Sequence, residues 1–445
     1  MIFFYIFFKL YDTYHNLRSK NKRPLFCKTF NQGIMKKVQL ILVFLLLLIT
    51  KGIAQTKLDA EIRPRSEYRH GFKTLFPNNT KAAFFTSQRT RLNLSHAIEK
   101  LNFYISIQDV RVWGDVPQLN LEDNNGLGLH QVWGELLLDT YWSLKLGRQE
   151  IVYDDSRFFG NVGWAQQSRS HDLALVRYKG GTFKMDIGLA FNQSQENLTG
   201  TNLTTPKTYK AMQYVWLHKD WSNFSGSFLF LNNGLQALNE LKYSQTIGTH
   251  LKIKKRHLNI ASNLYYQFGS NVASKNINAY LLGMEANYKT SDKTIFGLGI
   301  ELQSGNDYNL AADKNNAFTP FYGTNHKFNG FMDYFYVGNH IDNVGLLDLY
   351  AKANFKLNSN MSLTVFAHNF SAAADINVGV SKQLGTEIDL VYGYNFTKEI
   401  EIKAGYSQMF ASDGLKVLKE NDSNNVNNWG WVMVAIKPAL FLSKR

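Results

Sequence analysis

The dominant pattern in this chain is a strict alternation of apolar and polar residues. From Leu58 to Arg69, the even-numbered positions are mostly apolar, whereas the odd-numbered positions are Asp, Glu or Arg. The segments Thr182 to Asn192 and Leu347 to Lys356 repeat this pattern. Because successive side chains of a β-strand point to opposite faces, each segment is predicted to form a strand with one apolar and one polar face.

Applied to the whole chain, the alternation predicts an all-β fold. About eighteen strands are expected, of roughly the 9–11 residues that a tilted strand needs to cross a membrane. Their predicted first residues are Leu58, Phe84, Leu101, Leu129, Trp142, Leu173, Thr182, Tyr209, Asn223, Ser244, Leu258, Asn276, Thr294, Gly345, Ser362, Leu384, Glu399 and Trp429.

The connections between the predicted strands alternate between short and long. Residues 139–141 and 397–398 are examples of short connections, and residues 153–171 and 305–344 are examples of long ones. Outer-membrane barrels have short turns on the periplasmic side and long loops outside. The pattern therefore predicts a transmembrane antiparallel up-and-down β-barrel with short periplasmic turns and long extracellular loops.

A large secreted β-protein is the alternative fold. A soluble β-sandwich buries its apolar faces against each other and exposes its polar faces to water. Here the polar faces carry charges in nearly every predicted strand and the apolar faces are rich in aromatic residues, which favours a wide barrel with lipid outside and water inside. Aromatic residues near strand ends suit the interfacial girdles of such a barrel. They are Trp142, Tyr178, Trp216, Tyr288, Tyr394 and Trp429.

A short apolar run near the N-terminus has the layout of an export signal. Two lysines follow Met35, the stretch from Leu40 to Ile49 is apolar, and small residues precede Gln55. We expect residues 35–54 to be a cleaved signal peptide and residues 1–34 to be an upstream extension outside the fold. Residues 55–445 then form the outer-membrane barrel domain.

Removal of the leader changes the charge of the chain. Residues 1–54 hold nine of the 49 Lys and Arg residues but one of the 35 acidic residues, so the formal net charge falls from +14 to +6. The single cysteine, Cys27, is removed as well. The mature chain is therefore not basic enough to indicate a nucleic-acid partner, and it has no thiolate for a disulfide or a metal.

Several arginines fall on the predicted lumen faces. Arg63 and Arg65 share one face of the first strand, and Arg89 and Arg91 share one face of the second. Arginine and lysine groups in a pore favour anions through Coulomb attraction and bidentate contacts with carboxylates. The alternative is that these charges pair with acidic residues of neighbouring strands. The acidic residues are Asp59, Glu61, Glu67 and Asp109.

Two long connections combine charged, amide and aromatic side chains. The first runs from Gly147 to Asp172, and the second runs from Phe318 to Tyr334. Such loops can fold inward and narrow a pore, and aromatic and polar groups together suit stacking on sugar rings. The alternative is that the second loop packs on itself as a plug. The loop residues that could contact a solute are Trp164, Tyr322, His326, Lys327 and Asp333.

These two fragments resemble the alginate-export family of outer-membrane porins. The motifs are Gly147–Gln149 with the later Asp154, Arg157, Trp164, Arg169 and Asp172, and the run Gly323–Gly330 with Asp333. The resemblance implies an eighteen-stranded barrel whose electropositive constriction passes an anionic uronate polymer outward. For that constriction it implies Arg65, Arg89, Arg91, Arg111, Arg148, Arg157 and Arg169. Arg111 breaks the alternation after Gln108, so it needs a bulge or faces elsewhere.

The expected function is a porin-like channel for anionic solutes or polysaccharide in the outer membrane of a Gram-negative-type bacterium. Its partners would be outer-membrane lipid, the anionic saccharide and periplasmic export proteins. One alternative is a surface-exposed barrel that binds or adheres through its loops. Another is a barrel hydrolase, for which only His326 with Asp333 and His368 with Asn369 are suggestive. No HExxH, P-loop, GxSxG or dinucleotide motif is present, so we expect no cofactor and no metal.

Overall fold

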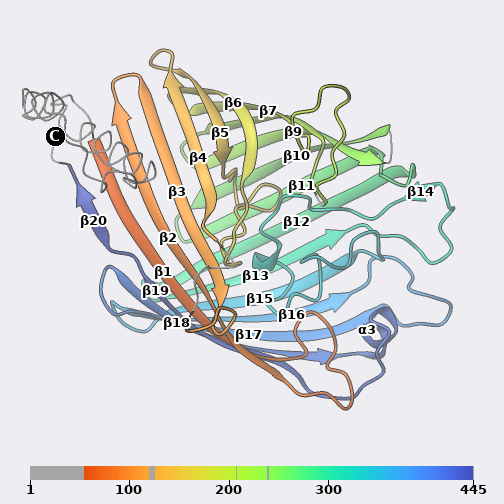
Figure 1. Ribbon diagram of the computed structural model, residues 1–445. Helices are drawn as coiled ribbons and strands as arrows, with labels where there is room; N and C mark the ends of the chain where they lie inside the picture. The colour runs from red at the N-terminus through yellow and green to blue at the C-terminus, as the bar shows by residue number, and fades with distance from the viewer. Residues whose placement is uncertain (1–54, 120–125, 207, 238–239, 444–445) are drawn as a thin grey trace, which may run out of the picture. The chain divides into compact units, whose positions relative to one another are not determined.

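The computed structural model describes residues 55–119, 126–206, 208–237 and 240–443. The predicted signal peptide (35–54) and upstream extension (1–34) lie outside these residues. The described chain consists mainly of β-strands that belong to one sheet (Figure 1). Within the described chain, no helix is long and apolar enough to cross a membrane.

Eighteen strands form the wall of the barrel. They are β1 (Gln55–His70), β2 (Ala83–Ile98), β3 (Leu101–Val112), β4 (Gly128–Leu137), β5 (Trp142–Gln149), β6 (His171–Gly180), β7 (Phe183–Phe191), β8 (Ala211–Asp220), β9 (Phe224–Ala237), β10 (Glu240–Lys255), β11 (Leu258–Ser270), β12 (Asn276–Ser291), β13 (Thr294–Gln303), β15 (Leu346–Lys356), β16 (Met361–Ser371), β17 (Gln383–Asn395), β18 (Ile400–Ala411) and β19 (Asn427–Ile436). The short elements are β14 (Lys314–Asn315), the 3-10 turn η1 (Asn325–Lys327), α3 (Asp413–Leu418) and β20 (Ala439–Leu442).

Each wall strand pairs antiparallel with the next, and the last returns to the first. β13 pairs directly with β15, and β19 pairs with β1 from Ile62 opposite Ile436 to His70 opposite Asn428. The sheet is therefore closed, and the predicted eighteen-stranded up-and-down barrel is confirmed. Every strand begins within four residues of its predicted first residue.

The two ends of the barrel differ in their connections. At one end, here called the turn end, the connections are short, such as residues 181–182 and 256–257. At the other, here called the loop end, they include residues 150–170 and 304–345. Two loop-end connections depart from the predicted alternation, because β9 and β10 are only two residues apart and residues 271–275 join β11 to β12.

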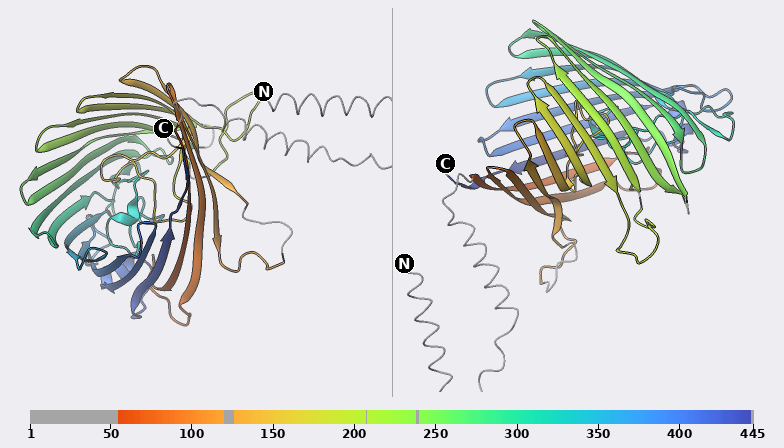
Figure 2. Two further views of the ribbon diagram at one scale, coloured as in Figure 1. Left: turned by 90° about the vertical axis from the view of Figure 1, so that its left-hand side faces the viewer. Right: turned by 90° about the horizontal axis from the view of Figure 1, so that it is seen from above.

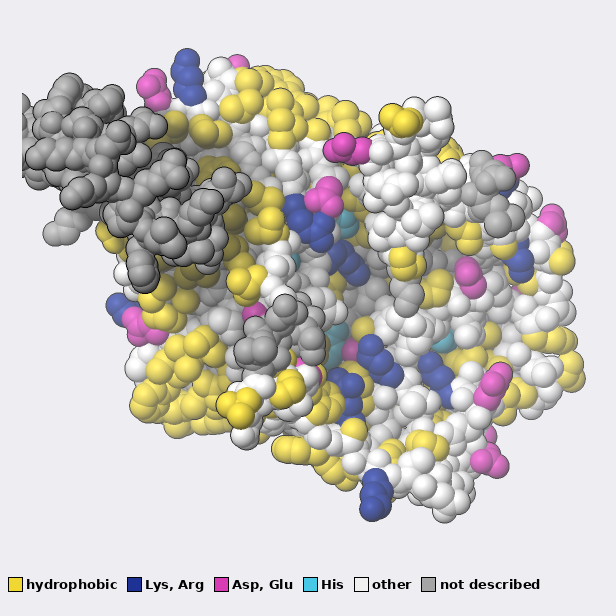
Figure 3. Space-filling view, in the orientation of Figure 1, with side chains coloured by type: hydrophobic (Ala, Val, Ile, Leu, Met, Phe, Trp, Pro, Cys, Tyr) yellow, Lys and Arg dark blue, Asp and Glu magenta, His cyan; other side chains and the backbone are white. Residues whose placement is uncertain are grey.

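The outward side chains form an apolar surface. Leu189, Leu298 and Val432 are 50%, 69% and 51% exposed, whereas Asp186 and Asp348, on inward faces, are 4% and 0% exposed. Hydrophobic side chains cover wide areas of the face shown in Figure 3. This distribution is the inverse of a soluble protein, and it suits lipid contact on the outside.

Two of the six aromatic residues expected in the girdles point inward instead. Trp216 is 8% exposed and its indole donates to Asp154 at 3.1 Å. Trp429 is fully buried, and its indole donates to Glu67 at 3.0 Å. Tyr288, by contrast, is 52% exposed on the outer face. Residue type alone placed Trp216 and Trp429 wrongly, because a buried acceptor in the lumen satisfies an indole as well as interfacial water does.

Two connections of the loop end fold into the barrel. They are the β5–β6 loop (residues 150–170) and the β13–β15 loop (residues 304–345). Phe158 and Phe318, one from each loop, are 3% and 1% exposed and pack with inward side chains of the wall. In the left view of Figure 2, the turquoise segment around residues 325–327 lies inside the ring of strands.

A second buried cluster fixes the β13–β15 loop near the loop end. Met332 and Tyr334 of the loop pack with Trp429 and with Leu415 of α3. His340 of the same loop is 6% exposed, and its Nε2 lies 2.9 Å from the Gly345 carbonyl oxygen. Burial and, to a smaller extent, the charge of Lys419 lower the pKa of His340 to about 3. His340 is therefore neutral while the loop is docked.

We expect arginine at Leu298 to destabilise the barrel by about 2–4 kcal/mol, because it would put a charge in the middle of a lipid-facing strand. The free energy of unfolding in lipid vesicles measures this effect. Leu198→Arg is the matched control, because Leu198 is fully exposed in the connection between β7 and β8. An equal loss in both variants would contradict a lipid-facing position for Leu298.

Acidification should loosen the β13–β15 loop. The pKa of His340 is about 3 when the loop is docked, against 6.5 ordinarily. The stabilisation of the docked loop by neutral His340 is therefore complete above pH 6.5 and is lost as the pH falls toward 3. At pH 5 the loss is about 2 kcal/mol. Amide hydrogen exchange of residues 334–345 at pH 7 and pH 5, corrected for intrinsic rates, measures it. His340→Gln should remove the difference, and a difference that persists in the variant would assign it to another group.

Candidate functional site

Three arginines on the lumen side of β1 and β2 bind the backbone of the β5–β6 loop. Arg63 donates hydrogen bonds to the three carbonyl oxygens of residues 163–165 at 2.7, 3.2 and 3.2 Å. Arg65 donates to the second of these oxygens at 2.6 Å. Arg89 donates to the carbonyl oxygen of Gln166 at 3.4 Å and to the hydroxyl of Ser168 at 2.9 Å. Buried carbonyl groups need such partners, so these guanidinium groups hold the loop in the lumen.

The side chain of Gln166 joins this loop to both strands. Its Oε1 accepts from Nε and Nη2 of Arg63 at 3.1 and 2.9 Å. Its Nε2 donates to the carbonyl and the hydroxyl oxygen of Ser87 at 3.2 and 3.0 Å. Gln166 is 5% exposed, so its hydrogen bonds are shielded from water. Sequence inspection gave this glutamine no role.

Two buried glutamates pair with the same arginines. Glu61 accepts two hydrogen bonds from Arg89 at 2.8 and 3.0 Å. Glu67 lies between Arg65, at 2.8 Å, and Arg69, at 2.9 Å. The pairing with Glu61 and Glu67 that the sequence left open is therefore present. The guanidinium groups nevertheless outnumber these carboxylates on the wall formed by β1 and β2.

Trp164 links the lumen face of β1 and β2, here called the arginine wall, to the β13–β15 loop. The guanidinium of Arg65 lies 3.9 Å from the centre of the Trp164 ring, a cation–π contact. His326 stacks on the indole with ring centres 4.7 Å apart. Nδ1 of His326 lies 2.6 Å from Oδ1 of Asp333. His326 is therefore oriented by Asp333 and stacked on the Trp164 indole.

Two of the predicted constriction arginines lie in the β5–β6 loop and join it to other segments. Arg157 is 1% exposed, and it pairs with Glu301 of β13 and with Oδ1 of Asn329 at 2.9 Å. Arg169 donates to the carbonyl oxygen of Gly323 at 2.9 Å. Both guanidinium groups are therefore engaged by the protein.

Tyr322 and Lys327 also lie where the two loops meet. The hydroxyl of Tyr322 donates to Asn233 on the inner wall at 2.6 Å, and the backbone of Tyr322 bridges to that of Phe159. Lys327 donates to the carbonyl oxygen of Asp155 at 2.7 Å. The five loop candidates thus hold the inner loops together, and Lys327 alone among them is exposed.

The remaining predicted arginines differ in their placement. Arg91 shares the inward face of β2 with Arg89 and donates to Gln108 at 2.9 Å. Arg111 lies opposite Gln88 in a ladder without a shift, so no bulge in that ladder accounts for its position. Its guanidinium binds both oxygens of Asp109 at 2.7 and 2.8 Å.

Arg148 belongs to the outward face of its strand. It lies opposite Asp172 of β6 and donates to that carboxylate at 2.7 Å. Leu146, two residues earlier on the same face, is 44% exposed. The next residue, Gln149, is fully buried on the inward face. The structure therefore does not bring Arg148 together with Arg65 and Arg89.

The strands β13 to β17 carry a cluster of buried acidic residues on the lumen side. Glu301, Asp348, Glu387 and Asp389 are each at most 6% exposed. Asn329 of the β13–β15 loop donates to Glu301 and Asp348 at 2.8 and 3.3 Å. These contacts fix the second loop to the wall as the arginines fix the first.

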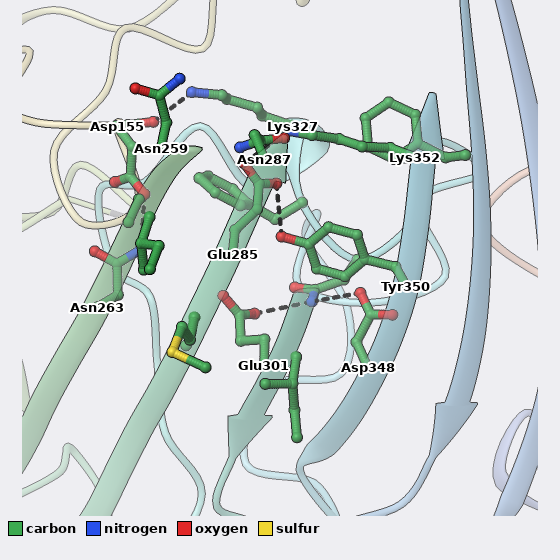
Figure 4. A pocket seen from close by; sticks show the side chains of 18 of the residues that line it. Asp155, Asn259, Asn263, Glu285, Asn287, Glu301, Lys327, Asp348, Tyr350 and Lys352 are labelled. Carbon is green, nitrogen blue, oxygen red and sulfur yellow. Dashed lines mark hydrogen bonds and ion pairs between the residues drawn. The ribbon is translucent and has the colours of Figure 1, made fainter. Parts of the chain in front are cut away.

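Two cavities lie on either side of the inner loops. The loop-end cavity encloses about 580 Å³ and is lined by Arg65, Arg69, Trp164 and His326, among others. The second, here called the turn-end chamber, encloses about 480 Å³ between Lys327 and side chains of β10 to β16 (Figure 4). His326 and Lys327 are neighbours in η1 but line different cavities, so this segment lies between them.

The closed sheet, the apolar exterior and the charged interior define an outer-membrane channel barrel. A family model described as alginate export matches residues 54–428. The chain therefore belongs to the alginate-export family, and its location is the outer membrane of a Gram-negative bacterium. The chain is an outer-membrane β-barrel channel of the porin and alginate-export type.

Solved outer-membrane proteins share the fold at low sequence identity. OpdQ of Pseudomonas aeruginosa is 13% identical with a TM-score of 0.56, over 87% of this chain and 98% of that chain. OccAB4 of Acinetobacter baumannii is 13% identical with a TM-score of 0.59, over 87% and 99%. OpdL of P. aeruginosa is 13% identical with a TM-score of 0.59, over 87% of this chain and 99% of that chain. No curated protein matches the chain.

We expect Gln166→Leu to loosen the β5–β6 loop. The variant removes hydrogen bonds to Arg63 and Ser87 that contribute about 1–3 kcal/mol when buried groups lose their partners. Amide exchange of residues 163–168 should be faster by about tenfold or more. Gln167→Leu is the matched control, because the neighbouring Gln167 side chain is exposed. Equal exchange in the two variants would show that Gln166 does not anchor the loop.

Proposed function

We propose that this barrel is a channel for anionic solutes, with an arginine-rich wall that favours their entry. The observation that carries the proposal is the wall formed by β1 and β2. Its lumen side presents five guanidinium groups, and two glutamates, Glu61 and Glu67, pair with three of them. The five are Arg63, Arg65, Arg69, Arg89 and Arg91.

The hydrogen bonds to the β5–β6 loop do not cancel this charge. A carbonyl oxygen is a neutral acceptor, so the guanidinium that binds it keeps its full positive charge. Inside a barrel with apolar surroundings, such charges act on ions at greater distance than they do in bulk water. We infer that the wall raises the local concentration of anions even though many of its donors are occupied.

Membership in the alginate-export family supports a saccharide as the cargo. We propose that the anions include carboxylated oligosaccharides or segments of an anionic polysaccharide. Aromatic rings at the inner loops, such as Trp164, suit the apolar faces of sugar rings. Export would bring the turn end into contact with periplasmic proteins that deliver the polymer.

A second candidate function follows from the inner loops. Because two loops fold into the lumen, the barrel could be closed and serve as a surface protein that binds through its outer loops. The two functions differ in conductance. Reconstituted protein that inserts into planar bilayers without conducting would favour the surface-binding function.

The reversal potential in a KCl gradient tests the proposed channel. We expect wild-type protein to prefer chloride, and we expect Arg89→Gln/Arg91→Gln to reduce that preference because two lumen charges are removed. Lys398→Gln is the matched control, because Lys398 is 88% exposed in a short turn and should not affect ions in the lumen. A cation preference in the wild type, or equal selectivity in the double variant, would contradict the proposal.

A further inference from the structure

The turn-end chamber contains carboxylates that are all engaged by the protein. Glu285 pairs with Lys352 at 2.6 Å and accepts from the Tyr350 hydroxyl at 2.9 Å (Figure 4). Asp155 accepts from Asn263 at 2.7 Å. Glu301 and Asp348, described above, accept from Asn329, and Asp348 also accepts from His368 at 3.0 Å. Each of these carboxylates therefore accepts at least one hydrogen bond from the protein.

The lysines of the same chamber are less engaged. Lys252 and Lys254 both lie on the inward face of β10, on the same side as the buried His250. Within the described residues, neither ammonium group forms a hydrogen bond or an ion pair. The ammonium of Lys327 donates one hydrogen bond, to the neutral carbonyl oxygen of Asp155, and lies 5.4 Å from the centre of the Phe328 ring, which leaves two of its three protons without a hydrogen-bond acceptor. The lining thus holds four lysines and four carboxylates, and three of the lysines, Lys252, Lys254 and Lys327, have unused donors.

The arginine wall offers the opposite combination. Arg63, Arg65 and Arg89 donate to the β5–β6 loop and to glutamates, so a solute would have to displace these hydrogen bonds to bind them directly. Lysine ammonium groups that face open space bind a carboxylate without that loss. Long-range attraction and direct binding are therefore assigned to different residues.

Aromatic side chains form another part of the chamber wall. Phe331 of the β13–β15 loop and Phe366 of β16 lie with ring centres 5.4 Å apart, and Tyr350 of β15 lies 6.5 Å from Phe366. Asn259, exposed on β11, adds an amide to the lining. Aromatic faces with amide and ammonium donors suit a ring that carries hydroxyl and carboxylate groups.

We propose that the turn-end chamber is a binding site for a carboxylate-bearing, sugar-sized solute, with Lys252, Lys254 and Lys327 as the groups that bind the carboxylate. Its volume of about 480 Å³ is in the range of small-molecule pockets, which suits one or two sugar rings rather than a long polymer segment. The proposal rests on the proposed anion channel, and it assigns solute binding to lysines near the turn end instead of the arginine wall.

Calorimetric titration of the detergent-solubilised full barrel with D-glucuronate tests the site. Wild-type protein should bind D-glucuronate and should bind D-glucose, which lacks the carboxylate, at least tenfold more weakly. Lys252→Gln/Lys254→Gln/Lys327→Gln should weaken D-glucuronate binding by about tenfold or more, because charge-assisted hydrogen bonds are lost.

Lys255→Gln is the matched control. Lys255 follows Lys254 on β10, so its side chain belongs to the other face of the strand. D-glucuronate affinity should be unchanged in this variant. Retention of the heat-modifiable band in gel electrophoresis shows that each variant is folded, and Lys327→Gln alone gives a milder variant if the triple variant is not.

The outcomes separate the chamber from the channel. If the protein prefers chloride in bilayers but does not bind D-glucuronate, the proposed binding site in the chamber is wrong and the proposed function stands. Binding that is equal in the wild type and the triple variant would overturn the assignment to these lysines. Binding by the chamber without any conductance would support the site and contradict the channel.

Discussion

The whole molecule depends on the satisfaction of backbone hydrogen bonds in lipid. The hydrocarbon core supplies no water to bind exposed N–H and C=O groups, so a membrane-spanning sheet must close on itself. Here β19 closes on β1, and no wall strand is left with an unpaired edge. Closure then divides every strand into a lipid face and a lumen face. The position of each charged or aromatic side chain along the wall follows from that division.

The lumen contains structure of its own. The inner loops bring carbonyl groups into the barrel, and these groups need donors as much as those of the strands do. Arg63, Arg65 and Arg89 supply them on one wall, while Asn329 and Arg157 bind the acidic wall. Buried arginine positions a loop through its donors, and in the proposed channel its charge would also act on solutes.

The two cavities differ in whether their positively charged side chains have unused hydrogen-bond donors. The loop-end cavity adjoins Arg65, which is bound to Glu67 and to a carbonyl oxygen. The turn-end chamber adjoins Lys252 and Lys254, which have no such partners among the described residues. Under the proposed function, the arginines would attract an anion into the lumen, and the lysines of the turn-end chamber would supply the free donors that bind it. A preference for anions and a binding site for one of them need not involve the same residues.

Period-two alternation in the sequence determined the strands, their number and the inward faces of Arg65, Arg89 and Arg91, because alternation is a local property of extended backbone. The same alternation could have assigned Arg148 to the outward face, since Gln149 beside it faces the lumen. It could also have found Lys252 and Lys254. Only the tertiary structure decided that the β5–β6 and β13–β15 loops enter the barrel, that Trp216 and Trp429 point inward, and which donors the loops occupy. Those outcomes rest on contacts between distant residues, such as Arg63 and Gln166, 103 positions apart, and local periodicity carries no information about such contacts.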